Sequence, residues 1–123
     1  MRLGQGRGCR GDSVILEQGD VIMVDFNPSI GYEPAKIRPA VVVSGYGFNS
    51  RANLVAVVPT TTKDNGYPLH LPVKCSGRSI GFACVELLRT IDVGRRGYEY
   101  LGCADDETVR TILASIRGML ELR

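Results

Sequence analysis

The stretch "IRPAVVVS" (residues 37–44) decides how this chain folds. An alanine and three valines follow one another without a polar interruption, and such a run is typical of a strand that is buried on both faces. Directly before the proline of this stretch stands Arg38. A core strand does not need a cation at its start, so the arginine indicates a site on the rim of a small barrel.

Short apolar segments recur on both sides of this stretch and predict a mainly β fold. They are separated by segments rich in Gly, Pro, Asn and Asp, the residues that punctuate strands. We expect residues 45–53 to form a loop, and we expect the strand that begins at Leu54 to stop at Pro59 because proline lacks an amide hydrogen. The other predicted strands cover residues 21–26, 39–44, 69–73, 81–88 and 89–93.

The end of the chain has a different periodicity. The segment "DDETVRTILASIRGMLELR" (residues 105–123) repeats its apolar residues at the spacing of an amphipathic helix, with Asp105 in a suitable place for the N-cap. The apolar positions are Val109, Ile112, Leu113, Ile116, Met119 and Leu120. Five to seven short strands followed by one helix predict a small β-barrel that an amphipathic C-terminal α-helix closes.

The bulk composition fits one soluble globular domain. The chain has 123 residues, of which 44% are hydrophobic and 23% charged. The net charge of +2 permits a polyanionic partner without requiring one. No apolar run approaches the roughly 20 residues that a transmembrane helix needs, so we expect no membrane partner.

The cysteines and the single histidine argue against a metal centre. No C-x-x-C pair is present, and His70 is the only histidine, which removes most zinc arrangements. We therefore expect no metal and no cofactor. His70 is expected to be a surface residue of a strand rather than a general base. The cysteines are Cys9, Cys75, Cys84 and Cys103, and the third of these lies in an apolar run where a thiol packs as a small hydrophobe.

The first 18 residues are glycine-rich and lack the apolar centre of a signal peptide. We expect residues 1–18 to be a disordered extension and residues 19–123 to form the folded domain. With no export signal in this stretch, the protein is expected to be cytoplasmic and to keep its thiols reduced.

Polar residues at two neighbouring strand ends form the candidate site. Arg38 precedes one strand, and the threonines of "PTTT" (residues 59–62) follow the next. If the two strands form an antiparallel hairpin, the start of the first lies beside the end of the second. A guanidinium and threonine hydroxyls can bind a phosphate and stabilise charge that develops in a transition state. A solvated arginine and an ordinary loop would give the same pattern.

These residues also carry a family resemblance. The stretches "GDVIMVDFNPSIGYEPAKIRPAVVVS" (residues 19–44), "VVPTTTKDNGYP" (residues 57–68) and "GFACVELLRTIDVGRRG" (residues 81–97) are similar to those of MazF/PemK toxins, endoribonucleases of bacterial type II toxin–antitoxin systems. With the helix, the resemblance extends to about residue 122. It implies an SH3-like β-barrel of the CcdB/PemK-like type and a homodimer. It also implies metal-independent cleavage of single-stranded RNA, usually mRNA, at short sequences.

The resemblance also implies roles for individual residues. Arg38 and Thr61 fall on the family's catalytic arginine and threonine, and cleavage by the RNA's own 2′-OH would leave a 2′,3′-cyclic phosphate and a 5′-OH. The residues expected to contact RNA or to organise the site are Tyr32, Glu33, Thr62 and Lys63. A leucine at position 87 replaces a glutamine that many relatives carry, so the RNA sequence recognised here is expected to differ.

Three functions remain open from the sequence. The first is an RNA-cleaving toxin that a MazE-like antitoxin neutralises by laying an acidic, disordered C-terminal segment into the RNA groove. The second is a non-enzymatic poison that resembles the CcdB gyrase inhibitors and would not need Arg38 or Thr61. The third is a small RNA- or protein-binding barrel without toxicity.

Overall fold

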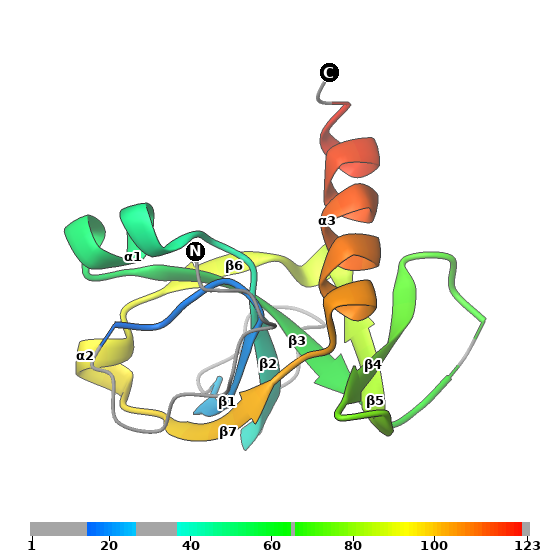
Figure 1. The fold of residues 1–123 in the computed structure, drawn as a ribbon, viewed down its shortest axis with the longest axis horizontal. Coiled ribbons are helices and arrows are strands. Elements are labelled where there is room, and N and C mark those ends of the chain that lie inside the picture. The colour runs from blue at the N-terminus through cyan, green and yellow to red at the C-terminus, as the bar shows by residue number, and fades with distance from the viewer. Residues whose placement is uncertain (1–14, 27–36, 65, 122–123) are drawn as a thin grey trace.

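Strand β2 (Ile37–Val42), which contains the valine run, lies inside one curled antiparallel sheet (Figure 1). The computed structural model describes residues 15–26, 37–64 and 66–121. Within them the sheet order is β4-β5-β3-β2-β1-β7, and β6 pairs with β3 beside this path. In chain order, the elements around β2 are β1 (Asp20–Asp25), α1 (Tyr46–Ala52), β3 (Val55–Thr61), β4 (His70–Cys75), β5 (Arg78–Cys84), the 3-10 helix η1 (Val85–Leu87), β6 (Arg89–Ile91), α2 (Val93–Arg96), β7 (Glu99–Cys103) and α3 (Asp106–Leu120).

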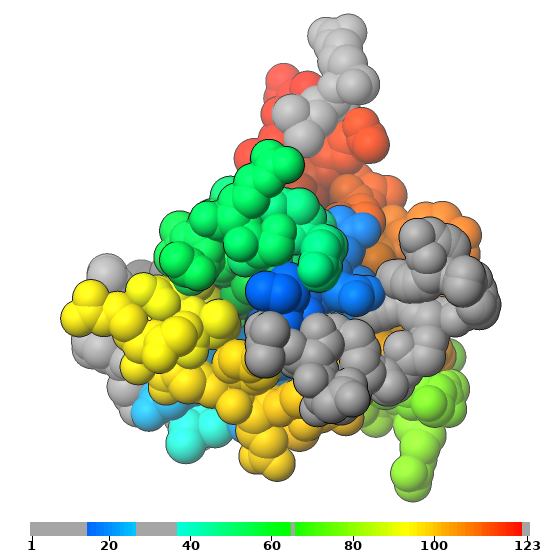
Figure 2. All heavy atoms as spheres, turned by 60° about the vertical axis from the view of Figure 1, so that its left-hand side comes forward, coloured from blue at the N-terminus to red at the C-terminus, as the bar shows by residue number. Residues whose placement is uncertain are grey.

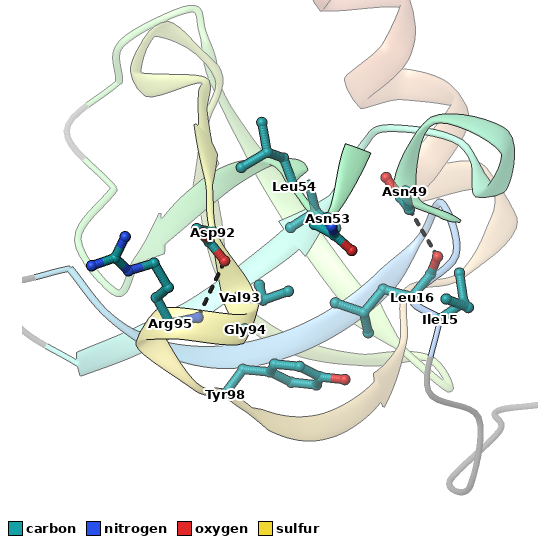
Figure 3. Close-up of a pocket in the computed structure, with 11 residues that line it drawn as sticks. Ile15, Leu16, Asn49, Asn53, Leu54, Asp92, Val93, Gly94, Arg95 and Tyr98 are labelled. Carbon is teal, nitrogen blue, oxygen red and sulfur yellow. Dashed lines mark hydrogen bonds between the residues drawn. The ribbon is translucent and has the colours of Figure 1, made fainter. Parts of the chain in front are cut away.

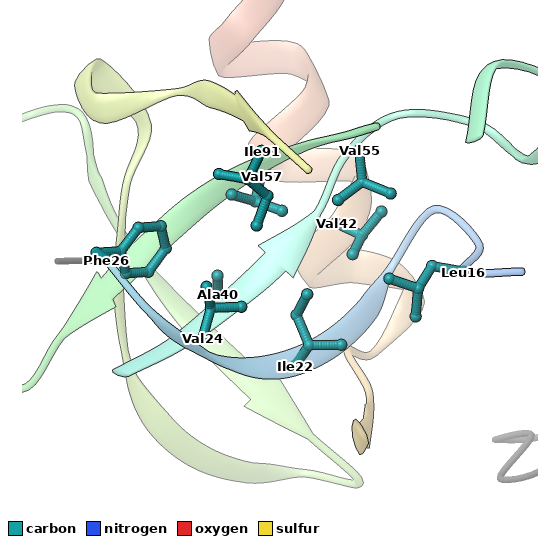
Figure 4. Close-up of a cluster of buried hydrophobic side chains, with 9 residues drawn as sticks. All are labelled: Leu16, Ile22, Val24, Phe26, Ala40, Val42, Val55, Val57 and Ile91. Atoms are coloured by element: carbon teal, nitrogen blue, oxygen red, sulfur yellow. The ribbon is translucent and has the colours of Figure 1, made fainter. Parts of the chain in front are cut away.

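Two apolar cores lie on the two sides of the central strands. Ala40 and Val42 point into the first, inside the curl of the sheet (Figure 4). Val41 and Val43 belong to the second, which also holds Ile112 of α3. Because successive side chains of a strand point to opposite faces, the uninterrupted valine run fills both cores. The predicted mainly β barrel with burial on both faces of this strand is confirmed.

Helix α3 follows the predicted periodicity. Val109, Leu113, Ile116 and Met119 pack against the second core, whereas Leu120 is 52% exposed. Asp105 is the N-cap residue, but its carboxylate makes no capping bond to the helix. It accepts instead from the amides of Ser76 and Gly77, at 2.7 and 2.9 Å, and so fixes the turn between β4 and β5.

The expected loop at residues 45–53 is wrong, because most of it forms helix α1. The glycines and asparagines of this stretch suggested a loop, yet a buried contact holds the helix in place. Asn49 is 6% exposed, and its Nδ2 donates to the carbonyl of Leu16 at 2.8 Å. Asn53 ends the helix with a φ of 58°, a conformation that asparagine tolerates well.

The expected stop at Pro59 is also wrong, because β3 continues to Thr61. On one side β3 pairs with β2, where Pro59 lies opposite Ala40. On its other side β3 pairs first with β6, at residues 55–57, and then with β5, from Thr60 onward. The proline falls where this change of partner occurs, and proline is tolerated where a strand does not need its amide.

Strand β7 has no counterpart among the predicted strands. It pairs with β1 and so covers that edge of the sheet. Residues 15–18 belong to the folded unit, since Leu16 is 3% exposed and packs in the first core. Residues 1–14, most of the expected extension, lie outside the described residues. Within the described ranges, no helix combines the length and the apolar character needed to cross a bilayer.

Candidate functional site

Arg38 and the end of β3 meet at one edge of the sheet. The register pairs Ala40 with Pro59 and Val41 with Val58, and continuing it by two residues places Arg38 opposite Thr61. The Nη1 of Arg38 donates to the carbonyl of Thr60 at 2.9 Å. Its Nε is buried and has no hydrogen-bond partner among the described residues. The guanidinium is therefore anchored at one nitrogen and keeps donor capacity for a ligand.

The three successive threonines have different surroundings. Thr60 is 2% exposed, and its hydroxyl donates to the carbonyl of Pro39 at 2.9 Å. Thr61 is half-buried, and its hydroxyl accepts from the amide of Lys63 at 3.2 Å. Thr62 and Lys63 are exposed. The first threonine is thus part of the core, whereas the next three residues can reach a ligand at the surface.

A close backbone approach holds Thr61 in place. Thr61 pairs with Phe82 of β5, and Thr60 pairs with Ala83. Gly81 has a φ of +133°, and a Cβ atom built on it would lie 2.7 Å from the carbonyl oxygen of Thr61. Because any side chain at this position would collide with that oxygen, the glycine lets β5 approach the candidate site.

A second polar cluster borders Arg38. Nε2 of His70 lies 2.8 Å from Oε2 of Glu86, and the two side chains are only 9% and 28% exposed. Cys84 lies beside them and is 4% exposed. Burial, and to a lesser extent the negative charge of Glu86, raise the pKa of the Cys84 thiol to about 11, while the nearby Arg38 acts in the opposite direction.

The sequence did not indicate this cluster. Cys84 packs as expected, but the expectation that His70 lies at the surface is wrong, since its ring is largely buried and in contact with Tyr67. His70 and Cys84 come together because they are paired in the register of β4 and β5. That register cannot be read from spacing alone, and so a pattern search could not connect these residues.

Two of the predicted RNA contacts, Tyr32 and Glu33, lie outside the described residues. The other four candidates, Arg38, Thr61, Thr62 and Lys63, lie together at or just after the edge where β2 begins and β3 ends. A guanidinium, a hydroxyl, an ammonium and nearby backbone amides form a set that suits an anionic ligand such as a phosphodiester.

A separate cavity of about 410 Å³ lies at the other end of β3 (Figure 3). Leu54 and Val55, at the start of that strand, border the cavity. The extended strand between Val55 and Thr61 is roughly 20 Å long, so the cavity is well separated from the candidate edge. Figure 2 shows α1 in green and α2 in yellow on this face, with the first described residues in blue beside them. None of the candidate residues lines this cavity, so we do not assign the proposed chemistry to it.

Comparisons with known proteins agree with this architecture. The MazF endoribonuclease toxin of Escherichia coli K12 is 34% identical over 106 residues, which cover 86% of this chain and 95% of that toxin. The ChpB endoribonuclease toxin of the same organism is 30% identical over 113 residues, again covering 86% and 95% of the two chains.

Solved structures show the same fold. A crystal structure of MazF from Deinococcus radiodurans matches with a TM-score of 0.80 and 24% identity, over 89% of this chain and all of that one. A mycobacterial endoribonuclease, solved with its cognate antitoxin, matches with a TM-score of 0.69 and 22% identity, over 90% and 98% of the two chains.

The family comparison covers most of the chain. The model of the PemK-like and MazF-like toxins of type II toxin–antitoxin systems matches residues 17–120. This range contains all the described strands and helices together with the candidate edge. The chain therefore belongs to the PemK/MazF toxin family.

Proposed function

We propose that this protein is a sequence-specific endoribonuclease toxin that cleaves single-stranded RNA, mainly mRNA, without a metal ion. The observation that carries the proposal is the guanidinium of Arg38, anchored on the carbonyl of Thr60 beside Thr61. Relatives that are named endoribonuclease toxins support the activity. Cutting mRNA in the cytoplasm would stop translation and growth.

The chemistry is an internal transesterification. The 2′-oxygen of the RNA attacks the adjacent phosphorus and loses its proton, while the bond from phosphorus to the 5′-oxygen breaks and that oxygen gains a proton. Arg38 stabilises the negative charge of the pentavalent transition state, which is the main task when no metal is used. Thr61 positions the phosphate or assists the leaving oxygen. The products are a 2′,3′-cyclic phosphate and a 5′-OH.

The surrounding residues bind the RNA in this proposal. Thr62 and Lys63 follow Thr61 directly, and both are exposed, so they can contact the neighbouring phosphates. Tyr32 is proposed to stack on a base, as aromatic side chains do in single-strand recognition, and Glu33 is proposed to organise the site.

The proposed partner is a MazE-like antitoxin with an acidic, disordered C-terminal segment. The solved relative that was captured with its cognate antitoxin supports this class of partner. Carboxylates of such a segment would compete with RNA phosphates for Arg38 and Lys63. The toxin is proposed to work as a homodimer, which light scattering after size-exclusion chromatography would test; a monomer at micromolar concentration would contradict the dimer.

The activity is tested by mapping cut ends on a long RNA by primer extension in excess EDTA. We expect discrete cuts at a short recurrent sequence, and the 3′ end of each upstream fragment should carry a cyclic phosphate. A second candidate, a CcdB-like gyrase poison, gains no support from relatives that are named endoribonucleases. Growth arrest with intact RNA and gyrase trapped on DNA would favour that candidate, and cutting that requires Mg²⁺ would contradict the metal-free mechanism.

A further inference from the structure

The buried cluster beside Arg38 has the composition of a metal site. His70 of β4 lies opposite Cys84 of β5 in the register, and Glu86 follows two residues later in η1. One imidazole nitrogen, the Cys84 sulfur and one Glu86 oxygen lie within 4.8 Å of one another. Among the described residues, this is the one group of three His, Cys, Asp or Glu side chains that could hold an ion.

The cluster is polar, largely buried and incompletely hydrogen-bonded. The His70 side chain is 9% exposed, and within the described part of the chain nothing bonds its Nδ1. Oε1 of Glu86 is buried as well, and it too has no partner among those residues. Buried polar atoms of native proteins are nearly always paired, so two neighbouring exceptions call for an explanation. An ion bound by Nε2 of His70 and by the Glu86 carboxylate would give Oε1 of Glu86 its missing partner.

We propose that His70, Cys84 and Glu86 bind a divalent transition-metal ion of the Zn²⁺ type. One nitrogen, one thiolate and one carboxylate are the ligands that zinc accepts, and three protein ligands leave a fourth position for water. The sulfur and nitrogen disfavour Mg²⁺ and Ca²⁺, which prefer oxygen ligands. Ligands of a tetrahedral zinc ion lie about 3.3–3.8 Å apart. The His70 nitrogen and the Glu86 oxygen, now 2.8 Å apart, would therefore need to separate by about 0.5 Å, and the most distant pair of the three ligand atoms would need to close by at most about 1 Å.

Binding changes the bonding of each residue in a defined way. The Cys84 thiol gives up its proton to the solvent and binds as thiolate, and the His70–Glu86 hydrogen bond is replaced by two bonds to the same ion. The site adjoins the candidate edge, because Ala83, next to Cys84, pairs with Thr60. It does not depend on the proposed RNA cleavage, and the ion has no role in that reaction.

Cobalt(II) tests the site with a direct signal, since a thiolate bound to Co²⁺ gives an intense charge-transfer band in the near ultraviolet. The full-length, reduced protein is titrated with Co²⁺ alone, and bound Co²⁺ is then displaced with Zn²⁺. We expect one ion per chain and a band that Zn²⁺ removes. Cys84→Ser should abolish the band, and Glu86→Gln should weaken Co²⁺ binding by at least about tenfold.

Cys75→Ser is the matched control, because Cys75 is also a cysteine outside any disulfide in the same hairpin but does not belong to the cluster. This variant should bind Co²⁺ like the wild type. Glu86→Gln, which can keep the hydrogen bond to His70, provides an answer even if Cys84→Ser does not fold. Absence of the band in the wild type, full affinity in Cys84→Ser or Glu86→Gln, or loss of the band in Cys75→Ser would overturn the proposal.

Discussion

At the scale of single residues, the candidate site is defined by how differently neighbouring side chains are held. Arg38 is anchored by a carbonyl that belongs to Thr60, while the Thr60 side chain turns to Pro39 and is buried. The next hydroxyl belongs to the half-buried Thr61 and accepts a long bond of 3.2 Å from the amide of Lys63. Three chemically identical residues therefore have separable roles.

Replacing each threonine by valine, which keeps its shape, should separate these roles. Thr60→Val removes a buried hydrogen bond and should lower the free energy of unfolding by about 1–3 kcal/mol. Thr61→Val should leave stability nearly unchanged but slow RNA cleavage by about 10- to 100-fold, because a hydroxyl near the phosphate is lost. Thr62→Val should change the free energy of unfolding less than Thr60→Val does, and the cleavage rate less than Thr61→Val does. Urea denaturation and single-turnover cleavage are the measurements, and full activity of a folded Thr61→Val would refute the role of Thr61.

In the metal-free protein, kept in EDTA, the Cys84 thiol should make the free energy of unfolding depend on alkaline pH. Burial raises its pKa from 9.0 to about 11, so between these values the unfolded chain releases a proton that the folded chain retains. Stability therefore falls as pH rises through this window, by on the order of 2 kcal/mol for this group. Compared with Cys84→Ala, the wild type should lose more free energy of unfolding between about pH 8.5 and pH 11. Parallel pH profiles for the two proteins would show that the thiol does not titrate as described.

At the scale of elements, β3 organises the site because it pairs with three other strands. Its first half pairs with β6 and its last two residues pair with β5, while β2 runs along its other side. The strand thus runs out of the core and ends at Thr61, beside Arg38 near the start of β2. The close approach of β5 at Gly81 is what fixes the carbonyl of Thr61.

Gly81→Ala should therefore disturb the site more than an equivalent change elsewhere. Gly102 is the matched control, since its φ of +146° resembles the +133° of Gly81 but no atom lies within 4 Å of the position that an added methyl group would take. Both substitutions strain the backbone, yet only the first also collides with the Thr61 oxygen. We expect Gly81→Ala to be less stable than Gly102→Ala by about 1–3 kcal/mol, and to cleave RNA more slowly. Equal melting temperatures of Gly81→Ala and Gly102→Ala would mean that the close approach of β5 to Thr61 does not restrict the residue at position 81.

The elements that sequence could predict are those whose pattern is decided by burial alone. The valine run of β2 and the apolar positions of α3 were predictable because these side chains pack into a core. Helix α1 could not be predicted from the sequence, because its stability comes from the contact of Asn49 with Leu16, which is distant in sequence. The continuation of β3 through Pro59 could not be predicted either, because it depends on which strand pairs with β3 at that point. This pairing overrides the tendency of proline to end a strand.

The same distinction applies to the candidate site. Arg38 and Thr61 could be placed on one edge because a single hairpin connects their strands, and the pairing of β2 with β3 brings them there. The cluster of His70, Cys84 and Glu86 requires the β4–β5 register as well, which spacing does not determine. The three ligands of the proposed metal site therefore come together only through the pairing of β4 with β5.

At the scale of the whole molecule, two regions lie at opposite ends of β3. One end holds the cationic edge with Arg38, and the other holds the cavity between α1 and α2 (Figures 1 and 3). The curled sheet keeps these regions apart, so a change near α1 should leave the candidate edge intact. Arg51 on α1 is exposed and provides a cation of the same kind at the far end of β3 from Arg38.

The most direct measurement is therefore single-turnover cleavage of one defined single-stranded RNA in excess EDTA by the wild type, Arg38→Ala and Arg51→Ala. The wild type and Arg51→Ala should cut at similar rates, and Arg38→Ala, with its fold verified by circular dichroism, should be at least about 100-fold slower. Undiminished cutting by Arg38→Ala, or no cutting by the wild type until a metal is added, would contradict the account.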